Sequence, residues 1–173
     1  MNTTSTAARL AAIFIGVAVL SLVGYFAISA GAAGRSAPTE LDLLDVSGAG
    51  VPVGDASKHP NPHPGDQVLL TDALYKWDGA HRGARVGHVY ATLSFRSGFS
   101  KTGAKVSIVG QLFLPSGSLL VEGFTTLSNG AAGFTLPVIG GTGVYAGSRG
   151  TLTTHDIGSN GSKSTMIVRL IGA

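Results

Sequence analysis

The sequence predicts an all-β domain, an eight-stranded antiparallel up-and-down β-barrel over residues 41–171, preceded by an N-terminal signal or membrane helix. Three observations predict this class. After residue 66, short β-prone segments follow one another without a convincing helix. The connections between them are short, and 26 glycines supply many turn and bulge positions. Because closing the sheet removes its exposed edges, a barrel is the architecture that we expect.

Eight segments carry the strand pattern, and most of them end at a turn signal. The predicted strands are 41–46, 67–75, 85–95, 104–114, 118–127, 134–139, 151–157 and 163–171. Asn160-Gly161, between the last two, is a strong hairpin signal. Residues 35–66 form a leader with the first strand and then a Pro/Gly-rich loop over 47–66, and residues 67–173 hold the remainder of the barrel.

The stretch VIGGTGVYAGSRGTL, Val138–Leu152, organises the second half of the chain. An apolar extended segment leads into its glycines and a Thr-rich segment comes after them, so we interpret it as a strand that bulges sharply and continues as another strand. A dinucleotide-binding loop is the alternative. The glycines at 141, 143 and 147 are spaced GxGxxxG rather than GxGxxG, and the segment after them is too rich in Gly and Thr for a helix.

Composition narrows the function classes. The formal charge of +3 is small and its Lys and Arg residues are scattered, which does not favour a nucleic-acid partner. There is no cysteine, so disulfides, zinc-thiolate sites and a thiol nucleophile are excluded. His59, His63 and Asp66 lie in a Pro-rich loop, which we interpret as solvated rather than as a metal site. We therefore expect neither a metal nor a cofactor.

The sequence of the N-terminal segment predicts that the folded domain lies outside the cytoplasm. No charged residue occurs from Leu10 to Gly34, and the run from Leu10 to Ile28 is mostly apolar. Ala30-Gly31-Ala32 has the form of a signal-peptidase site, which favours a cleaved secretory signal. The length of the run equally fits an uncleaved membrane anchor. Residues 1–34 are thus predicted to be a signal peptide or an N-terminal anchor.

Several predicted strands are apolar on both faces. In the strand 67–75, Val68, Leu70 and Leu74 alternate with Leu69, Ala73 and Tyr75. Because a barrel strand has only one inner face, the outer apolar face needs a cover, and a homo-oligomer (dimer or trimer) would supply it. Scattered exposed apolar residues are the alternative.

Few residues could carry chemistry. Asp72 shares a face with Val68, Leu70 and Leu74, so it is either tuned for proton handling or turned outward to meet an Arg or Lys. Glu122 and Arg169 have similar apolar neighbours on their strands and could pair with each other. The chain has no GxSxG elbow and no credible serine triad.

Three blocks resemble a known family. LPVIGGTGVYAGSRGTL (136–152), GDQVLLTDALYKWDGAHRGARVG (65–87) and, faintly, GQLFLPSGSLLVEG (110–123) are similar to dirigent proteins and to the allene oxide cyclase barrel. The resemblance implies an apolar lumen in which Asp72 replaces the cyclases' second-strand asparagine, with Asp42 as the first-strand carboxylate. Arg149 matches the arginine of the dirigent late-strand element. The cyclases' third-strand cysteine has no counterpart here.

These features leave two hypotheses. The first is a cofactor-free isomerase or cyclase that acts on a hydrophobic small molecule, with Asp72 and Asp42 as catalytic residues and Arg149, Glu122 and Arg169 as ligand-binding residues. The second is a non-catalytic dirigent-like barrel that steers stereochemistry or carries a ligand. A buried carboxylate with a perturbed pKa favours the first.

Overall fold

The computed structural model describes residues 39–58, 61–127, 133–157 and 162–171. The chain divides into two compact units, Met1–Gly31 and Ala32–Ala173, and every described residue belongs to the second. The predicted signal or anchor over residues 1–34 therefore lies outside the described residues, as does the Asn160-Gly161 turn. No helix in the described part of the chain is long and apolar enough to cross a membrane.

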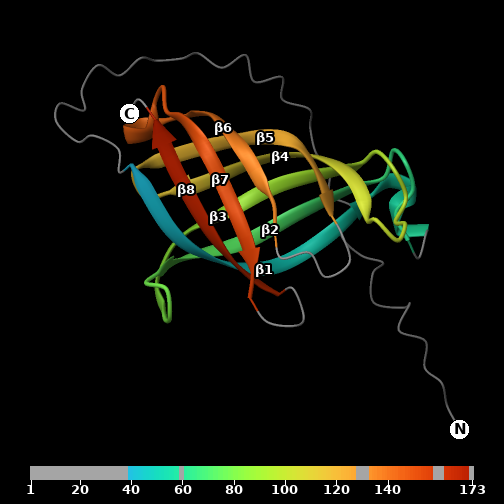
Figure 1. Cartoon of the computed structure of the whole chain (residues 1–173), viewed down its shortest axis with the longest axis horizontal. Helices are drawn as coiled ribbons and strands as arrows, with labels where there is room; N and C mark the ends of the chain where they lie inside the picture. Colours follow the sequence, from blue (N-terminus) through green and yellow to red (C-terminus); the bar gives the residue numbers. More distant parts are fainter. Residues whose placement is uncertain (1–38, 59–60, 128–132, 158–161, 172–173) are drawn as a thin grey trace, which may run out of the picture. The chain divides into compact units, whose positions relative to one another are not determined.

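The described residues form a closed barrel of eight antiparallel strands, which confirms the predicted fold class (Figure 1). Each strand pairs with its neighbours in the sequence, and the last strand pairs with the first. The strands are β1 (Glu40–Val53), β2 (Gln67–Trp77), β3 (Arg82–Phe95), β4 (Ala104–Leu114), β5 (Gly117–Leu127), β6 (Thr135–Gly141), β7 (Arg149–Asp156) and β8 (Lys163–Ile171). Two short 3-10 helices, η2 (Gly54–Lys58) and η3 (Gly143–Tyr145), complete the elements.

The first strand is longer than predicted. The sequence predicts a strand over 41–46 and a loop after it, whereas β1 continues to Val53. Its second half, from Ala49 to Val53, pairs with β2 alone, because pairing with β8 ends at Val46. No other described strand pairs with the second edge of that half, and an edge position tolerates Pro52, which has no N–H to donate. Glycine and proline there mark a bulge and an edge rather than a loop.

The glycine-rich stretch is a turn, not a bulged continuous strand. β6 ends at Gly141, η3 comes next, and β7 returns antiparallel to β6. Gly143 and Gly147 have φ of +62° and +81°, a region that disfavours residues with a Cβ. A Cβ on Gly141 would lie 2.5 Å from the Tyr145 carbonyl oxygen, so the chain passes too close to itself for a side chain there. No α-helix opens after these glycines, which is consistent with rejecting a dinucleotide-binding loop.

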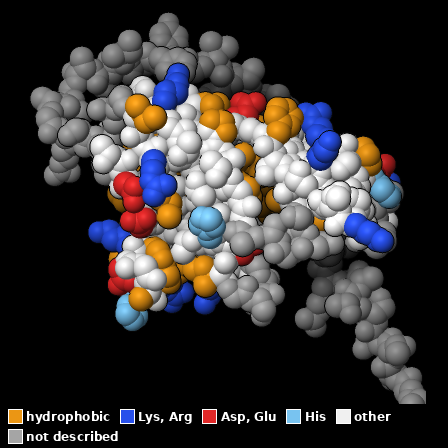
Figure 2. Space-filling model, viewed as in Figure 1, with side chains coloured by type: hydrophobic (Ala, Val, Ile, Leu, Met, Phe, Trp, Pro, Cys, Tyr) orange, Lys and Arg blue, Asp and Glu red, His pale blue; other side chains and the backbone are white. Residues whose placement is uncertain are grey.

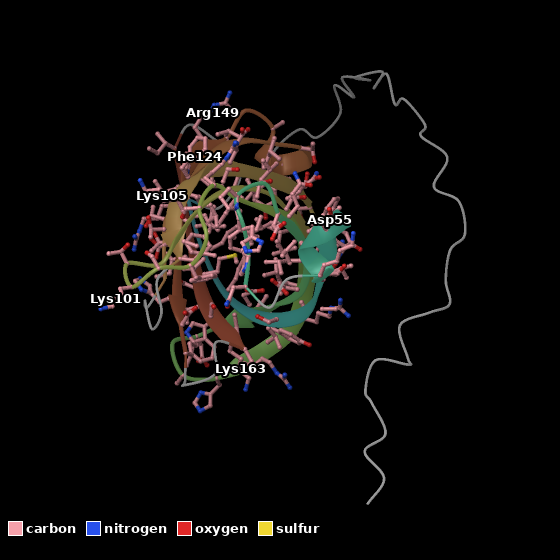
Figure 3. All side chains as sticks on the ribbon, turned by 90° about the vertical axis from the view of Figure 1, so that its right-hand side faces the viewer. Asp55, Lys101, Lys105, Phe124, Arg149 and Lys163 are labelled. Carbon is pink, nitrogen blue, oxygen red and sulfur yellow. The ribbon has the colours of Figure 1, made fainter. Side chains whose placement is uncertain are left out.

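Apolar side chains fill much of the interior of the barrel. Alternate residues of every strand point inward, and Figure 3, which looks along the barrel, shows a ring of strands with side chains inside it. Leu74, Leu119 and Val168 are fully buried, and burial of each such side chain contributes about 1.5–3 kcal/mol to stability. The labelled Lys101, Lys105 and Arg149 lie outside the ring (Figure 3).

The outside of the barrel is sparsely charged. Figure 2 shows the face around β7 and β8, where most of the surface is uncharged and charged side chains are scattered. Elsewhere, exposed apolar side chains gather on the outer face of five consecutive strands. They are Val51 and Val53 on β1, Leu69 on β2, Tyr90 on β3, Val109 on β4, and Leu120 and Phe124 on β5. We call this set the outer apolar face.

Candidate functional site

The interior of the barrel contains a cavity of about 230 Å³. Its wall is mainly aliphatic, and every strand contributes to it. The lining residues are Asp45, Ser47, Leu70, Asp72, Val89, Ala91, Leu93, Ile108, Gly110, Leu112, Val121, Leu127, Phe134, Leu136, Leu152, Thr154, Ser164 and Met166. Among the described residues, Asp45 and Asp72 are the only ionisable side chains of that wall. The site is thus an apolar chamber with acidic groups on one side.

A β-bulge brings the two carboxylates to the cavity. The β1–β2 register runs regularly to Val46↔Ala73 and resumes at Ala49↔Thr71, so Ser47 and Gly48 stand opposite Asp72 alone. The extra residue frees the Gly48 N–H from the strand ladder, and this N–H donates a 2.8 Å hydrogen bond to Asp72 Oδ1. Asp72 is therefore held at the bulge by a backbone donor.

Asp45 is the more unusual of the two carboxylates. The residue is only 8% exposed, and its buried Oδ1 has no hydrogen-bond partner among the described residues. Burial raises the pKa of Asp45 to about 7, and the nearby charge of Asp72 adds to the increase. A carboxyl group with a pKa near neutrality holds or releases a proton at physiological pH, which is the property needed for general acid–base chemistry.

The hydroxyl groups of the cavity wall are partly engaged elsewhere. Ser164 lies opposite Asp45 in the β1–β8 register, but its Oγ donates to Asp156 Oδ1 at 2.9 Å. Thr154 Oγ1 accepts a 3.1 Å hydrogen bond from the Phe134 N–H. Both contacts tie neighbouring backbone and side chains together. Asp45 also lines the cavity, and its buried Oδ1 has no hydrogen-bond partner among the described residues.

The structure separates the residues that the sequence singled out. Asp72 lines the cavity, so the structure has the inward one of the two placements that its apolar alternation allowed. Asp42 is exposed and does not line it, because β1 alternates Leu43 and Asp45 inward and Asp42 outward. The first-strand carboxylate of the lumen is therefore Asp45. Arg149 is exposed at the start of β7 and donates from Nη1 to the adjacent Ser148 carbonyl oxygen at 3.2 Å.

The suggested pairing of Glu122 with Arg169 is not formed. Arg169 on β8 donates from Nε to Glu40 Oε2 at 2.9 Å, across the β1–β8 pair. Glu122 is exposed on the outer side of β5, opposite Val109 of β4. Neither residue lines the cavity. Their strands bring them to other partners because β5 and β8 are not neighbours in the barrel.

Asp45 is not among the residues that the sequence singled out, and its local pattern explains why. Leu41, Leu43 and Asp45 alternate with Asp42, Leu44 and Val46, so each set is mixed apolar and acidic. Alternation alone cannot say which set faces inward. The signal that was available is the Ser47-Gly48 pair, since a glycine inside a strand pattern indicates a bulge.

The Pro-rich loop contributes to a turn at the start of β2. Asp66 is buried, and its Oδ2 accepts a 2.7 Å hydrogen bond from the His63 N–H. Within the described residues, no group of three or more His, Asp or Glu side chains is placed to hold a metal ion, and His59 lies outside them. The carboxylate of Asp66 is thus engaged by backbone.

Comparison with known proteins identifies the fold. No protein-family model matches the chain, and no curated relative matches it. Pyocyanin demethylase is 21% identical with a TM-score of 0.58, over 76% of this chain and 99% of that one. A nonspecific haem-binding cyclase that catalyses a 4 + 2 cycloaddition during neoabyssomicin biosynthesis is 16% identical, with a TM-score of 0.58 over 78% of this chain and 66% of that one. The pterocarpan synthase dirigent protein GePTS1 is 15% identical, with a TM-score of 0.60. The match covers 76% of this chain and 86% of that one.

These solved structures confirm, at the level of the fold, the resemblance to dirigent and cyclase barrels. Their identities to this chain are too low to transfer a reaction or a ligand. The chain spans about two thirds of the haem-binding cyclase and nearly all of the demethylase.

Proposed function

We propose that this protein is a small-molecule barrel of the cyclase or isomerase kind, which binds a hydrophobic ligand in its lumen and needs no cofactor. The observation that carries the proposal is the apolar cavity with Asp45 and Asp72 as its only ionisable wall residues among those described. An apolar chamber binds by shape and excludes water, and a few polar groups then orient the ligand. Proteins of the same fold include a cyclase and a dirigent protein.

Asp45 is the proton-handling group in this proposal. Its pKa of about 7 lets the carboxyl group both donate and accept a proton at neutral pH. An isomerisation then balances without a redox partner: one proton passes from Asp45 to a carbon atom of the ligand, and another returns from a different ligand carbon to the same carboxylate. Asp72, fixed by the Gly48 N–H, orients the ligand, and its charge adds to the increase in the pKa of Asp45 that burial mainly causes.

The alternative is a dirigent-like barrel that steers or carries a ligand without turnover. The observation that favours it is that the cavity wall has few reactive groups. Besides the two carboxylates, its described polar groups are backbone atoms and the hydroxyls of Ser47, Thr154 and Ser164. Shape alone would then set the stereochemical outcome. Such a barrel retains the ligand and returns it unchanged.

One experiment distinguishes the two. The purified barrel is incubated with source-organism extract, retained ligands are identified by native mass spectrometry, and each is then incubated with the protein in D₂O. An isomerase should leave deuterium at a carbon position of the recovered ligand, and Asp45→Asn should abolish this, while the exposed Asp55→Asn should not. A ligand that returns unlabelled from the unaltered protein supports the carrier, and no retained ligand at all contradicts both.

We also propose that the barrel acts outside the cytoplasm, secreted or anchored by residues 10–28. The support is the uncharged apolar run with its small-residue exit. Cell fractionation with N-terminal sequencing tests it. Mature protein should begin near residues 31–33 or keep the run in the membrane fraction, and full-length protein in the cytoplasm would contradict both forms.

A homo-oligomer is the last part of the proposal. The outer apolar face includes a groove of about 480 Å³ lined by Leu69, Tyr90, Val109 and Leu120 among others. Apolar surface of this extent on adjacent strands is typical of subunit contacts. Light scattering should show a dimer or trimer that Val109→Asp dissociates, while Ile171→Asp, exposed but outside this face, leaves it intact. A monomer at micromolar concentration would contradict it.

A further inference from the structure

The cavity has an unbalanced charge. Two carboxylates face it, whereas no described Lys, Arg or His side chain lines it. The described cations of β7 and β8 lie elsewhere: Arg169 pairs with Glu40, and Lys163 and Arg149 are exposed. A carboxylate taken out of water without a partner is unfavourable unless something compensates it.

Asp45 is the buried carboxylate of this cavity whose charge no described group balances. The residue is more than nine-tenths buried, it lines the cavity, and its Oδ1 accepts no hydrogen bond from the described residues. Asp72, in contrast, already accepts a hydrogen bond from the Gly48 N–H. The unfilled requirement, within the described residues, is therefore a hydrogen-bond donor for the Asp45 carboxyl group, and a donor with a positive charge would satisfy it best.

We propose that the natural ligand of the cavity is a small apolar molecule with a basic nitrogen, whose N–H binds Asp45 beside Asp72. The inference rests on the proposed function only in taking this cavity as the ligand site. The aliphatic wall, with Leu112, Val121 and Met166 on it, contacts the hydrocarbon body of the ligand. The two carboxylates contact its nitrogen. The wall therefore selects against anions and against purely hydrocarbon ligands.

The charge of Asp45 sets the pH dependence of binding. The groups that face it are Asp72 and Leu74 of β2, Ser164 and Met166 of β8, and Thr154 of β7, of which only Asp72 is charged. Asp45 loses its proton as the pH rises through about 7, so its attraction for a cation increases over that range. Binding of a cation below this pH should release a proton, because the cation stabilises the ionised carboxylate.

Three probes of nearly equal shape test the ligand class: 2-aminoindane, 2-indanol and indane-2-carboxylate. Each is titrated calorimetrically into the barrel at about pH 8 and about pH 5.5, in two buffers of different ionisation enthalpy that count released protons. Competition with an apolar fluorescent dye locates binding in the cavity. The proteins are the unaltered chain, Asp45→Asn, Asp72→Asn and the exposed control Asp55→Asn, each checked for folding by circular dichroism.

The amine should bind about tenfold more tightly than the alcohol at the higher pH, and the carboxylate least tightly. The preference should shrink several-fold at the lower pH, and disappear in Asp45→Asn but not in Asp55→Asn. If amine and alcohol bind equally in competition with the dye, the inference is wrong while the cavity remains a ligand site. If no probe and no dye binds, the proposed function fails with it.

Discussion

The β1–β2 pair and the β4–β5 pair build the two sides of the barrel differently. β4 and β5 form an uninterrupted ladder from Ala104↔Leu127 to Leu114↔Gly117. The β1–β2 ladder is broken between Val46 and Ala49. The regular pair gives the cavity only apolar side chains and a glycine, whereas the broken pair supplies both carboxylates.

The regular β4–β5 pair contributes to stability, whereas the broken β1–β2 pair provides the groups that could carry out chemistry. A regular ladder satisfies every backbone group and packs its inward side chains against the core. The bulge leaves one N–H outside the ladder, which becomes the donor for Asp72, and it places acidic groups where burial is unfavourable. We expect removal of a buried charge on the broken side to stabilise the fold, and truncation of a buried apolar side chain on the regular side to destabilise it.

Removing the charge of Asp45 should produce the largest effect, a gain. Its pKa is raised from 3.8 to about 7, so between these values the folded state holds a proton that the unfolded state has lost. The free energy of unfolding therefore falls as the pH rises from about 4 to about 7, by about 4 kcal/mol from this group. Urea titrations should show Asp45→Asn more stable at about pH 8 and little changed at about pH 4. Asp55→Asn should keep the slope of the unaltered protein, and an equal slope in Asp45→Asn would contradict the assignment.

Truncation on the regular side should cause the largest loss. Leu119 of β5 is fully buried, so Leu119→Ala should lower the free energy of unfolding by about 3 kcal/mol through lost burial and the cavity left behind. Ile171 of β8, which is 72% exposed and lies outside the outer apolar face, is the control. Ile171→Ala should cost less than about 1 kcal/mol. Similar losses in both variants would show that this part of the barrel is not packed as described.

The bulge itself is tested by two glycines of β1. A Cβ on Gly48 would lie within 2.0 Å of the Thr71 carbonyl oxygen, so Gly48→Ala must move backbone and weaken the bond to Asp72. Gly50→Ala meets only flexible side chains, the nearest being Leu70 at 3.3 Å. Thermal unfolding should place Gly48→Ala about 2 kcal/mol below Gly50→Ala. Equal stabilities would mean that the bulge accommodates a side chain.

The smallest effect is expected at the outer ion pair. Arg169 and Glu40 have side chains 59% and 47% exposed, so water screens their attraction. A double-mutant cycle with Arg169→Ala and Glu40→Ala should give a coupling energy below about 1 kcal/mol, weaker still at high salt. A coupling of several kcal/mol would indicate a buried pair and therefore another arrangement of β1 against β8.

Local pattern was sufficient for most of the architecture. The strand predicted over 104–114 matches β4, and 163–171 matches β8. These segments carry β-prone residues between turn signals, so each strand is specified within its own few residues. Local alternation likewise placed Asp72 on an apolar face, and the structure shows that this face lines the cavity. The local pattern gave the wrong prediction for 47–53. Glycine and proline there indicate a loop, whereas the segment forms a strand that pairs with β2, which lies beyond the Pro-rich loop.

The amino-acid sequence by itself determined that this chain forms eight strands, that they are numerous enough to close, and that Asp72 has apolar neighbours. Only the tertiary structure decided which first-strand carboxylate meets Asp72. Asp42 and Asp45 lie in one short segment with apolar residues on both faces, and the pairing of β1 with β2 and β8 turned Asp45 inward. A side chain's orientation follows local alternation, but the register that assigns the inner face depends on strands distant in the sequence. For the same reason only the closed barrel reveals that Asp45 Oδ1, from which the chemistry of this barrel is inferred, has no partner among the described residues.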